Sequence, residues 1–537
     1  MHHVPTTGLK GLKENWQSDL LSGFLVSLIA LPLSLGIASA SNFPPIMGVM
    51  TAIVGGIIVA FFAGSEPTIK GPAAGLIVIV AGAVEELGRG NLELGWKLAL
   101  GVIIVAGALQ VLLGLLKVAK LADFFPLAAV HGMLAAIGVI IMSKQLHLAV
   151  GISPAELKGK EPLELIEMVP HSLAHMEWHV ALIGLVSLAI LFGLPMIKNN
   201  LLKKVPPALI VLIVSIFMGL GFHLSDVHEY GNIKPLVNPG EFSLKVNAIF
   251  GAWSGDLLPI AFKYLAMFTL IGSLESLLTG KAIDLLDPFK RKSNLSKDLT
   301  AVGIGNMVSA VLGGLPMISE VARSSANLTN GGKTRWSNFF HGLFLLFFVV
   351  VLTPFIKMVP VAALSAMLIA VGFRLANPKE FRHMYHIGKE QLVVFVVTII
   401  ATLATDLLIG IAVGIAVEFL IQVILGMPVK YMFSPVISVD TTGKSHVMTV
   451  RGAAVFTNYL SIKKHLDRLP LGEEVVIDLE HALYVDHTVM ENLHNYKRDY
   501  LSNGGQFTVV NIDEHKPLSE HPLAARRKTK VTTMATR

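Results

Sequence analysis

The sequence predicts an α-helical membrane protein with many spans, followed by a small cytoplasmic α/β domain. The 537 residues are 53% hydrophobic and only 15% charged, with a mean hydropathy of +0.66. A typical globular chain carries about 25% charged residues. Long apolar runs recur up to residue 425, and a more polar sequence with short strand-like and helix-like stretches follows them. This change in character separates a membrane part from a domain outside the lipid.

The apolar runs have the length of a bilayer crossing, which takes about 20 residues. Backbone polar groups in lipid must be paired within their own segment, and the runs lack the alternation of barrel strands, so we expect helices. We predict about fourteen spans between residues 20 and 427. The clearest runs, of single or double length, are residues 20–40, 98–116, 178–197, 258–280, 339–356 and 392–425.

Lysine and arginine cluster in alternate connections, which predicts the orientation in the membrane. Residues 1–19 are polar and also contain lysines, so an even number of spans places both termini in the cytoplasm. The net charge of +6 follows from this pattern and does not indicate a nucleic-acid partner. We expect a multi-pass protein of a bacterial inner membrane, surrounded by lipid. The main basic clusters are Lys117 and Lys120; Lys198, Lys203 and Lys204; Lys281 to Lys297; Lys333 and Arg335; and Arg374 to Lys389.

The last part of the chain predicts a separate α/β domain over residues 435–525. Strand-like and helical stretches alternate there, and they are too polar to insert into lipid. Residues 526–537 read as a basic disordered tail. The expected strands are residues 436–440, 446–450, 475–479 and 507–511, and the expected helices are residues 458–469 and 487–501.

Two short segments interrupt the membrane pattern, EPTIKGPAAGL at residues 66–76 and GGLPMISEVARSSAN at residues 313–327. They open the third and tenth apolar runs, and each places a proline, Pro72 or Pro316, near the expected first turn of a short helix. Interrupted segments at matching places in two halves of a chain indicate a transporter's binding site. Opposed helix N-termini would bind an anion there. Prolines that only kink full-length helices are the alternative.

Charged residues lie beside both interruptions. Lys70 precedes the first short helix, and Arg323 and Ser324 are expected two turns into the second. Cations at membrane depth face protein, water or a counter-charge, so they either attract a substrate anion or neutralise resident carboxylates. Glu320 precedes Arg323 at the spacing of an intrahelical ion pair. Pairing of Glu320 with Lys70, with Arg323 or with a bound cation stays open.

The eighth apolar run carries a candidate site for a coupling ion. Glu275 and Thr279 stand four residues apart, on one helical face. A carboxylate at membrane depth suits a proton carrier, and with Thr279 it could equally ligate sodium. A buried glutamate bonded to neighbouring backbone is the structural alternative. We expect no cofactor or metal beyond this sodium ion or proton.

Several function classes are excluded by what the sequence lacks. No phosphate-binding loop of the form G-x-x-x-x-G-K-[ST] occurs, which argues against ATP-driven transport within this chain. No nucleophile and base stand in a recognisable arrangement, so we do not expect an enzyme. The chain has no cysteine, so disulfides and thiolate metal sites are absent from it.

The motifs resemble those of the SulP family of anion transporters. They are ALPLSLGIASA at residues 30–40, GPAAG at 71–75, LESLLT at 274–279, and the second interruption followed by GGKTRWSNFFHG. VVIDLEHALYVDHTVMENL, residues 475–493, resembles the family's C-terminal STAS domain. The resemblance implies two inverted halves of seven spans, a core domain and a gate domain, an elevator-type movement and a homodimer.

The resemblance also implies positions for the functional residues. Backbone N–H groups near Ala73 and Ser319 would hold the anion, and Arg323 would supply positive charge. A glutamate at position 275 leaves sodium and proton coupling open. The implied anion site comprises Pro32, Lys70, Gly71, Ala73, Ala74, Ser319, Glu320, Arg323 and Ser324. The implied coupling-ion site comprises Glu275, Thr279 and Ser319.

In the STAS domain, Asp486 and Thr488 are the candidate regulatory residues. His487 stands between them where a phosphorylatable serine often lies, so the resemblance argues against phosphorylation at that position. A cytoplasmic partner of this domain is a further expectation.

We therefore expect secondary active transport of a small inorganic anion, bicarbonate or sulfate, coupled to sodium or protons. Two other functions stay open at this point. The chain could be a membrane regulator that senses an anion and signals through the STAS domain, or an uncoupled anion channel.

Overall fold

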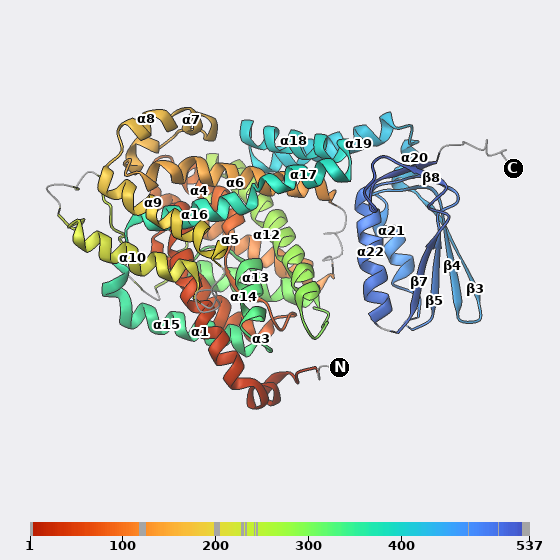
Figure 1. Ribbon diagram of the computed structural model, residues 1–537, viewed down its shortest axis with the longest axis horizontal. Helices are drawn as coiled ribbons and strands as arrows, with labels where there is room; N and C mark the ends of the chain where they lie inside the picture. The colour runs from red at the N-terminus through yellow and green to blue at the C-terminus, as the bar shows by residue number, and fades with distance from the viewer. Residues whose placement is uncertain are drawn as a thin grey trace. The chain divides into compact units, whose positions relative to one another are not determined.

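The computed structural model describes residues 4–117, 125–197, 205–226, 230, 233–240, 242, 245–470, 472–502 and 504–528. The chain forms two compact units. The first comprises residues 1–119 and 137–375, and the second comprises residues 120–136 and 376–537. Figure 1 shows the first unit as a bundle of helices, and the strands β3 to β9 of the second unit as a sheet with helices on one face. We describe each unit by itself.

Helices dominate the first unit, as its apolar runs predict. Within the described ranges, nine helical stretches are long and apolar enough to cross a membrane, and one shorter apolar helix is α10. The helices are α1 (Gly8–Ala40), α2 (Pro45–Val54), α3 (Ala60–Phe62), α4 (Ile77–Gly88), α5 (Leu92–Leu115), α6 (Leu127–Ala149, shared with the second unit), α7 (Pro162–Glu167), α8 (Val169–Ala174), α9 (Trp178–Gly193), α10 (Pro207–Gly221), α12 (Leu258–Leu286), α13 (Leu295–Val311), α14 (Val321–Thr329), α15 (Trp336–Ile356) and α16 (Val361–Leu375).

The apolar runs expected from the sequence coincide with helices, and the double run at residues 392–425 is divided into α18 (Lys389–Ala404) and α19 (Leu407–Ile424). The segments follow the predicted order of two sets. The first set is α1, α2, α4, α5, α6, α9 and α10, and the second is α12, α13, α14, α15, α16, α18 and α19. The basic residues Lys120, Lys198, Lys203 and Lys204 lie outside the described residues.

The helix α1 begins at Gly8 and continues without a break through residue 19 into the first apolar run, so most of the polar N-terminal segment belongs to the same helix as that run. The buried side chain of Asp19 explains why a polar stretch joins a membrane helix. Its carboxylate accepts hydrogen bonds from the backbone N–H groups of Lys333 and Thr334, at 2.7 and 3.1 Å, and from the Thr334 hydroxyl. Asp19 thus fixes α1 to the segment that leads into α15.

The two interruptions predicted from the sequence are confirmed. Residues 69–72 form the strand β1 (Ile69–Pro72), which pairs antiparallel with β2 (Met317–Glu320). After β1 the chain resumes as a short 3-10 turn, η2 (Ala74–Leu76), and α4; after β2 it resumes as α14. The residue before a proline is restricted to extended conformations. This restriction, at Gly71 and at Leu315, keeps the chain from starting a helix too early.

Two positions in the second interruption differ from the expectation. Pro316 precedes β2 and is not in the first turn of α14. Arg323 and Ser324 lie in the first turn of α14 rather than two turns into it, because the strand takes up the residues between the proline and the helix. The guanidinium therefore lies nearer the helix N-terminus than the sequence indicated.

The second unit contains the predicted α/β domain. The strand order is β7-β5-β4-β6-β9-β8, with β3 paired to β4, and β4 runs parallel to β5 and β6. Helices α21 and α22 cover one face of this sheet (Figure 1) and bury Ile462 and Leu493 against Val475 and Phe507. The elements are α17 (Pro378–Ile387), α18, α19, α20 (Val429–Phe433), β3 (Val436–Thr442), β4 (Ser445–Ala454), α21 (Tyr459–Leu466), β5 (Glu474–Asp478), β6 (Ala482–Val485), α22 (His487–Ser502), β7 (Gln506–Val510), β8 (His515–Pro517) and β9 (Arg526–Lys528).

The four strands and two helices expected in this domain are confirmed, and β6, β8 and β9 were not expected. The assignment of residues 526–537 to a disordered tail is wrong at its start, because Arg526–Lys528 forms β9 and pairs with β6 and β8. These strands are too short to show a sequence period. Residues 529–537 lie outside the described residues.

Close packing in the first unit depends on glycine where helices cross. A Cβ atom on Gly342 of α15 would lie 2.8 Å from the Cα of Gly56, and one on Gly56 would lie 2.5 Å from the Cα of Gly342. Small residues let backbones approach in this way inside membranes.

We expect Gly342→Ala to lower the stability by about 1–3 kcal/mol, because the added methyl group overpacks this crossing. Thermal unfolding of the detergent-purified protein, followed by loss of the monodisperse elution peak, measures the effect. Gly193→Ala at the end of α9 is the matched control, since a Cβ atom there meets nothing within 4 Å. Equal midpoints for the two variants would contradict this packing argument.

Candidate functional site: the junction of the two half-helices

The candidate site lies in the first unit, where the two interrupted segments meet. β1 and β2 pair so that Lys70 lies opposite Ser319 and Gly71 opposite Ile318. The first half-helix is η2 with α4, residues 74–88, and the second is α14, residues 321–329. The predicted anion-site and coupling-ion residues lie in α1, α12 and α14, in the two strands, or at the start of the first half-helix. The structure therefore brings together residues that are far apart in the sequence.

Arg323 is the most distinctive residue of this junction. Its side chain is only 1% exposed, yet its Nε and Nη1 atoms have no hydrogen-bond partner in the described structure. The third nitrogen, Nη2, donates to Ser34 Oγ of α1 at 3.2 Å. Buried donors without a protein partner are uncommon in folded proteins, so this guanidinium has donors left for a further acceptor.

Gly71 gives the guanidinium access to the first half-helix. A Cβ atom on Gly71 would clash with Arg323 Nη1, so only glycine lets the charge approach β1 this closely. Pro32 is buried in α1, in the same helix as Ser34. The positive charge of Arg323 thus lies beside the strand that leads into η2 and α4.

Two carboxylates approach the same junction. Glu275 of α12 is 8% exposed, and its Oε1 atom has no hydrogen-bond partner among the described residues. A Cβ atom on Gly75 would clash with this carboxylate, so Glu275 lies directly against the backbone of η2. Glu320 also has an unpartnered buried Oε1 atom, and the backbone N–H of Ala74 lies within hydrogen-bonding reach of its side chain.

One of the predicted relations of Glu320, its proximity to Arg323, is present in the structure. The charges nearest to it include Arg323 and Arg374, and no side chain caps the N-terminus of α14, which begins directly after Glu320. Thr279 is buried one turn along α12 from Glu275, as expected from their spacing.

The backbone N–H groups expected to hold the anion already have protein partners. The N–H of Ala73 donates to the carbonyl of Pro316 at 3.4 Å, and the N–H of Ser319 donates to Ser276 Oγ at 3.3 Å. Ser324 Oγ accepts a hydrogen bond from the N–H of Ile69 at 2.9 Å. Ala73, Ser319 and Ser324 thus join the two segments to each other and to α12, and their predicted role as ligands of the anion stays a prediction.

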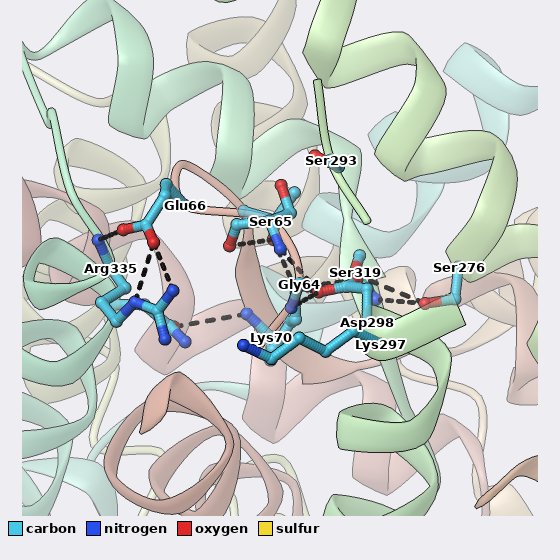
Figure 2. Close-up of polar contacts among 12 residues, drawn as sticks. Gly64, Ser65, Glu66, Lys70, Ser276, Ser293, Lys297, Asp298, Ser319 and Arg335 are labelled. Carbon is cyan, nitrogen blue, oxygen red and sulfur yellow. Dashed lines mark hydrogen bonds and ion pairs between the residues drawn. The ribbon is translucent and has the colours of Figure 1, made fainter. Parts of the chain in front are cut away.

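Lys70 also has a different position from the one expected of an anion ligand. Its ammonium group is fully buried and forms an ion pair with Asp298 of α13, with Nζ 2.9 Å from Oδ1. Figure 2 shows Asp298 between Lys70 and Ser319, whose hydroxyl donates to Asp298 Oδ2 at 2.9 Å. Neither Glu320 nor a substrate is needed to neutralise Lys70.

Asp298 is the functional candidate that sequence reasoning missed. It lies in the first turn of α13, after the N-cap residue Asn294, where an acidic residue is ordinary because it complements the helix dipole. A second ion pair near it, Arg335 with Glu66, has Nε 3.0 Å from Oε1 (Figure 2). In the sequence these charges lie outside or at the edge of the apolar runs, so nothing indicated that they would be close to Lys70.

The candidate regulatory residues lie in the second unit. Asp486 caps α22: its Oδ1 accepts from the N–H of Val489 at 2.7 Å, and its Oδ2 accepts from the N–H of Phe456 at 2.6 Å and from Gln422 Nε2 at 3.1 Å. Burial raises the pKa of Asp486 to about 7, against these hydrogen bonds, which lower it. Thr488 is 2% exposed and accepts a hydrogen bond from the N–H of Leu127, so its hydroxyl is not accessible to a kinase in this conformation.

Comparison with known proteins identifies the family. The profile of the sulfate permease family matches residues 16–398. The chain is 28% identical to the putative sulfate transporter YvdB of Bacillus subtilis strain 168 over 400 aligned residues. This alignment covers 74% of this chain and 72% of that protein.

Two solved structures share the fold. The transmembrane domain of a cyanobacterial bicarbonate transporter, BicA, superposes with a TM-score of 0.65 at 24% identity and covers 74% of this chain and 97% of that structure. The murine anion transporter Slc26a9 in its inward-facing state gives a TM-score of 0.66 at 16% identity, over 92% of this chain and 85% of that structure. The C-terminal sheet is consistent with a STAS domain.

The matched residues make up more than half of the chain and contain both half-helices with Lys70, Glu275, Asp298 and Arg323. The resemblance of the motifs to SulP anion transporters is thereby confirmed, and so is the expected helical membrane transporter fold. The chain belongs to the sulfate permease family, whose members are multi-pass membrane transporters of anions and not enzymes.

Proposed function

We propose that this protein carries bicarbonate or sulfate across the membrane by secondary active transport, with the anion bound at the junction of the two half-helices. The observation that supports this most is the guanidinium of Arg323, which is buried and has two nitrogens without hydrogen-bond partners beside the interrupted segments. An arginine fork matches the geometry of planar and tetrahedral oxyanions. The relatives named as sulfate and bicarbonate transporters support the same two substrates.

The binding groups in this proposal differ in part from those implied by the sequence. Arg323 supplies charge and donors, and the uncapped first turn of α14 supplies backbone donors. Gly71 provides the space, and Pro32 lies in the neighbouring helix. Ala73, Ser319 and Ser324 hold the strands in position, and Lys70 is excluded because Asp298 neutralises it.

Glu275 is the proposed coupling residue, with the proton as the coupling ion. Glu275 and Glu320 are close enough to repel each other electrostatically, and each has an unpartnered oxygen. Protonation of one carboxylate would remove this repulsion and would remove one negative charge next to an arriving anion. Sodium bound by Glu275, Thr279 and the neighbouring Ser319 is the competing proposal, and the uptake experiments below separate the two.

The remaining parts of the proposal concern the assembly. The lysine and arginine pattern supports cytoplasmic termini and, in a bacterium, an inner-membrane location. An elevator-type movement and a homodimer are proposed from the resemblance of the motifs to the SulP family. A partner of the STAS domain would act from the cytoplasm.

We expect Arg323→Ala to lower the apparent affinity for the transported anion about 10-fold to 100-fold, because one charged donor group is lost from a buried site. Uptake of radiolabelled bicarbonate and sulfate by proteoliposomes measures this loss, and Arg323→Lys should recover part of it. Arg89→Ala is the matched control, since Arg89 is 61% exposed in a loose ion pair with Asp256. Uptake and affinity unchanged in Arg323→Ala would show that the site is elsewhere.

We expect Glu275→Gln to abolish the acceleration of uptake by an inward proton gradient, because an amide cannot release a proton. Uptake is compared in proteoliposomes under imposed proton, sodium or no gradient. Glu93→Gln is the control, since Glu93 is 73% exposed and pairs with Lys97 on α5. If the unchanged protein responds to sodium and not to protons, the sodium proposal replaces this one. Flux that ignores both gradients in the unchanged protein would indicate a channel.

A pH response is expected at the start of α22. The pKa of Asp486 is raised above its ordinary value of 3.8 to about 7. Its stabilising contribution is therefore complete below the ordinary pKa and is lost as the pH rises through about 7. We expect hydrogen exchange in α22, corrected for its intrinsic pH dependence, to speed up between about pH 5 and pH 8. Asp486→Asn should flatten this response, while Asp440→Asn on the exposed side of β3 should retain it.

A further inference from the structure

The ammonium group of Lys70 is held by oxygen atoms from two other residues. Its Nζ lies 2.9 Å from Asp298 Oδ1 and 3.1 Å from Asp298 Oδ2 (Figure 2). It donates a third hydrogen bond to Thr68 Oγ1. The Lys70 side chain is 0% exposed, and that of Asp298 is 3% exposed. A carboxylate and a hydroxyl are also the oxygen ligands that a free cation would require at membrane depth.

Asp298 connects this cation to several parts of the junction. Its Oδ1 also accepts from the N–H groups of Gly64 and Ser65, at 3.0 and 3.2 Å, and its Oδ2 accepts from Ser319 Oγ at 2.9 Å. The carboxylate thus joins the loop before β1, β1 itself and β2 to the start of α13. Charge-assisted hydrogen bonds of this kind are stronger than neutral ones, and they depend on the carboxylate staying ionised.

Close backbone contacts hold the loop before β1 against the start of α13. A Cβ atom on Gly64 would clash with the carbonyl of Asn294 and would lie 2.6 Å from the backbone nitrogen of Asp298. The N–H of Asn294 in turn donates to the carbonyl of Gly64 at 2.9 Å. Because the backbone holds the oxygen atoms in place, removal of the ammonium group would leave a preformed set of cation ligands with an uncompensated negative charge.

We propose that the ammonium group of Lys70 takes the place of a bound cation: it fills a cation site made by Asp298 and Thr68. The Asp298 carboxylate, which also accepts from Ser319, holds both interrupted segments to α13. Replacement of Lys70 by a short side chain opens the site to a small free cation. The site differs from the coupling site proposed at Glu275 and Thr279, and the inference stands whether or not the anion is bound by Arg323.

The test is the thermal unfolding midpoint of the purified full-length protein in sodium chloride, methylammonium chloride or choline chloride at equal concentration. In choline, which is too large for the site, we expect Lys70→Ala to unfold about 5 °C or more below the unchanged protein, because a buried carboxylate has lost its partner. Methylammonium, which replaces the lost group, and sodium should each recover part of this difference. Each midpoint is compared with that of the unchanged protein in the same salt, so the effect of a cation bound elsewhere on the protein cancels.

Two controls separate this site from general effects of charge. Lys70→Ala combined with Asp298→Asn should lose the selective recovery, because the carboxylate that binds the free cation is gone. Lys97→Ala, which removes a partly exposed ion pair with Glu93, should show neither the loss nor the recovery. A Lys70→Ala protein that unfolds like the unchanged protein, or recovers equally in all three salts, would overturn the proposal.

If Lys70→Ala cannot be purified in any of the salts, Lys70→Gln tests whether the site needs a positive charge. The glutamine amide can donate to Asp298 but carries no charge, and it occupies the space of the cation. We expect this variant to fold with a lowered midpoint that methylammonium does not raise. A midpoint equal to that of the unchanged protein would show that the charge of Lys70 is not needed, and the proposal would then be wrong.

Discussion

The structure of the junction depends on one constraint, which is that lipid offers no partner to a backbone N–H or carbonyl group. A helix satisfies its own groups, and a segment that stops being helical must find partners in another segment. β1 and β2 supply them to each other, and Ser276 and Ser324 accept the N–H groups of Ser319 and Ile69 at their margins. Each interruption is therefore possible because the other lies beside it.

The buried charges of the junction are of two kinds, which differ in whether their polar atoms are paired within the protein. Lys70 and Asp298 form a closed pair whose donors and acceptors are used within the protein. Arg323, Glu275 and Glu320 form an open group, in which each side chain keeps at least one polar atom without a partner among the described residues. A closed pair fixes geometry, whereas an open group has capacity left for an anion and a proton. Chemically similar residues at one junction thus differ in how many of their polar atoms are paired within the protein.

The sequence revealed the interruptions because proline and charged residues are rare inside apolar runs, and their places in the order of spans showed that they correspond. It did not reveal the strands, because β1 and β2 are four residues each and their pairing joins positions that are far apart in the chain. The partner of Lys70 was missed for a related reason. Asp298 has the position of an ordinary acidic residue in the first turn of a helix, and only the folded chain brings it to the ammonium group.

The pairing of β1 with β2 has a consequence for how the protein is made. Residues 69–72 leave the ribosome long before residues 317–320, and until then their extended backbone has no matching strand. The third span is therefore incomplete while the chain between them is inserted, and it needs shelter from lipid in the insertion machinery or beside other spans. A chain cut between the two halves would leave each with an open edge inside the bilayer, so neither half is a self-sufficient folding unit.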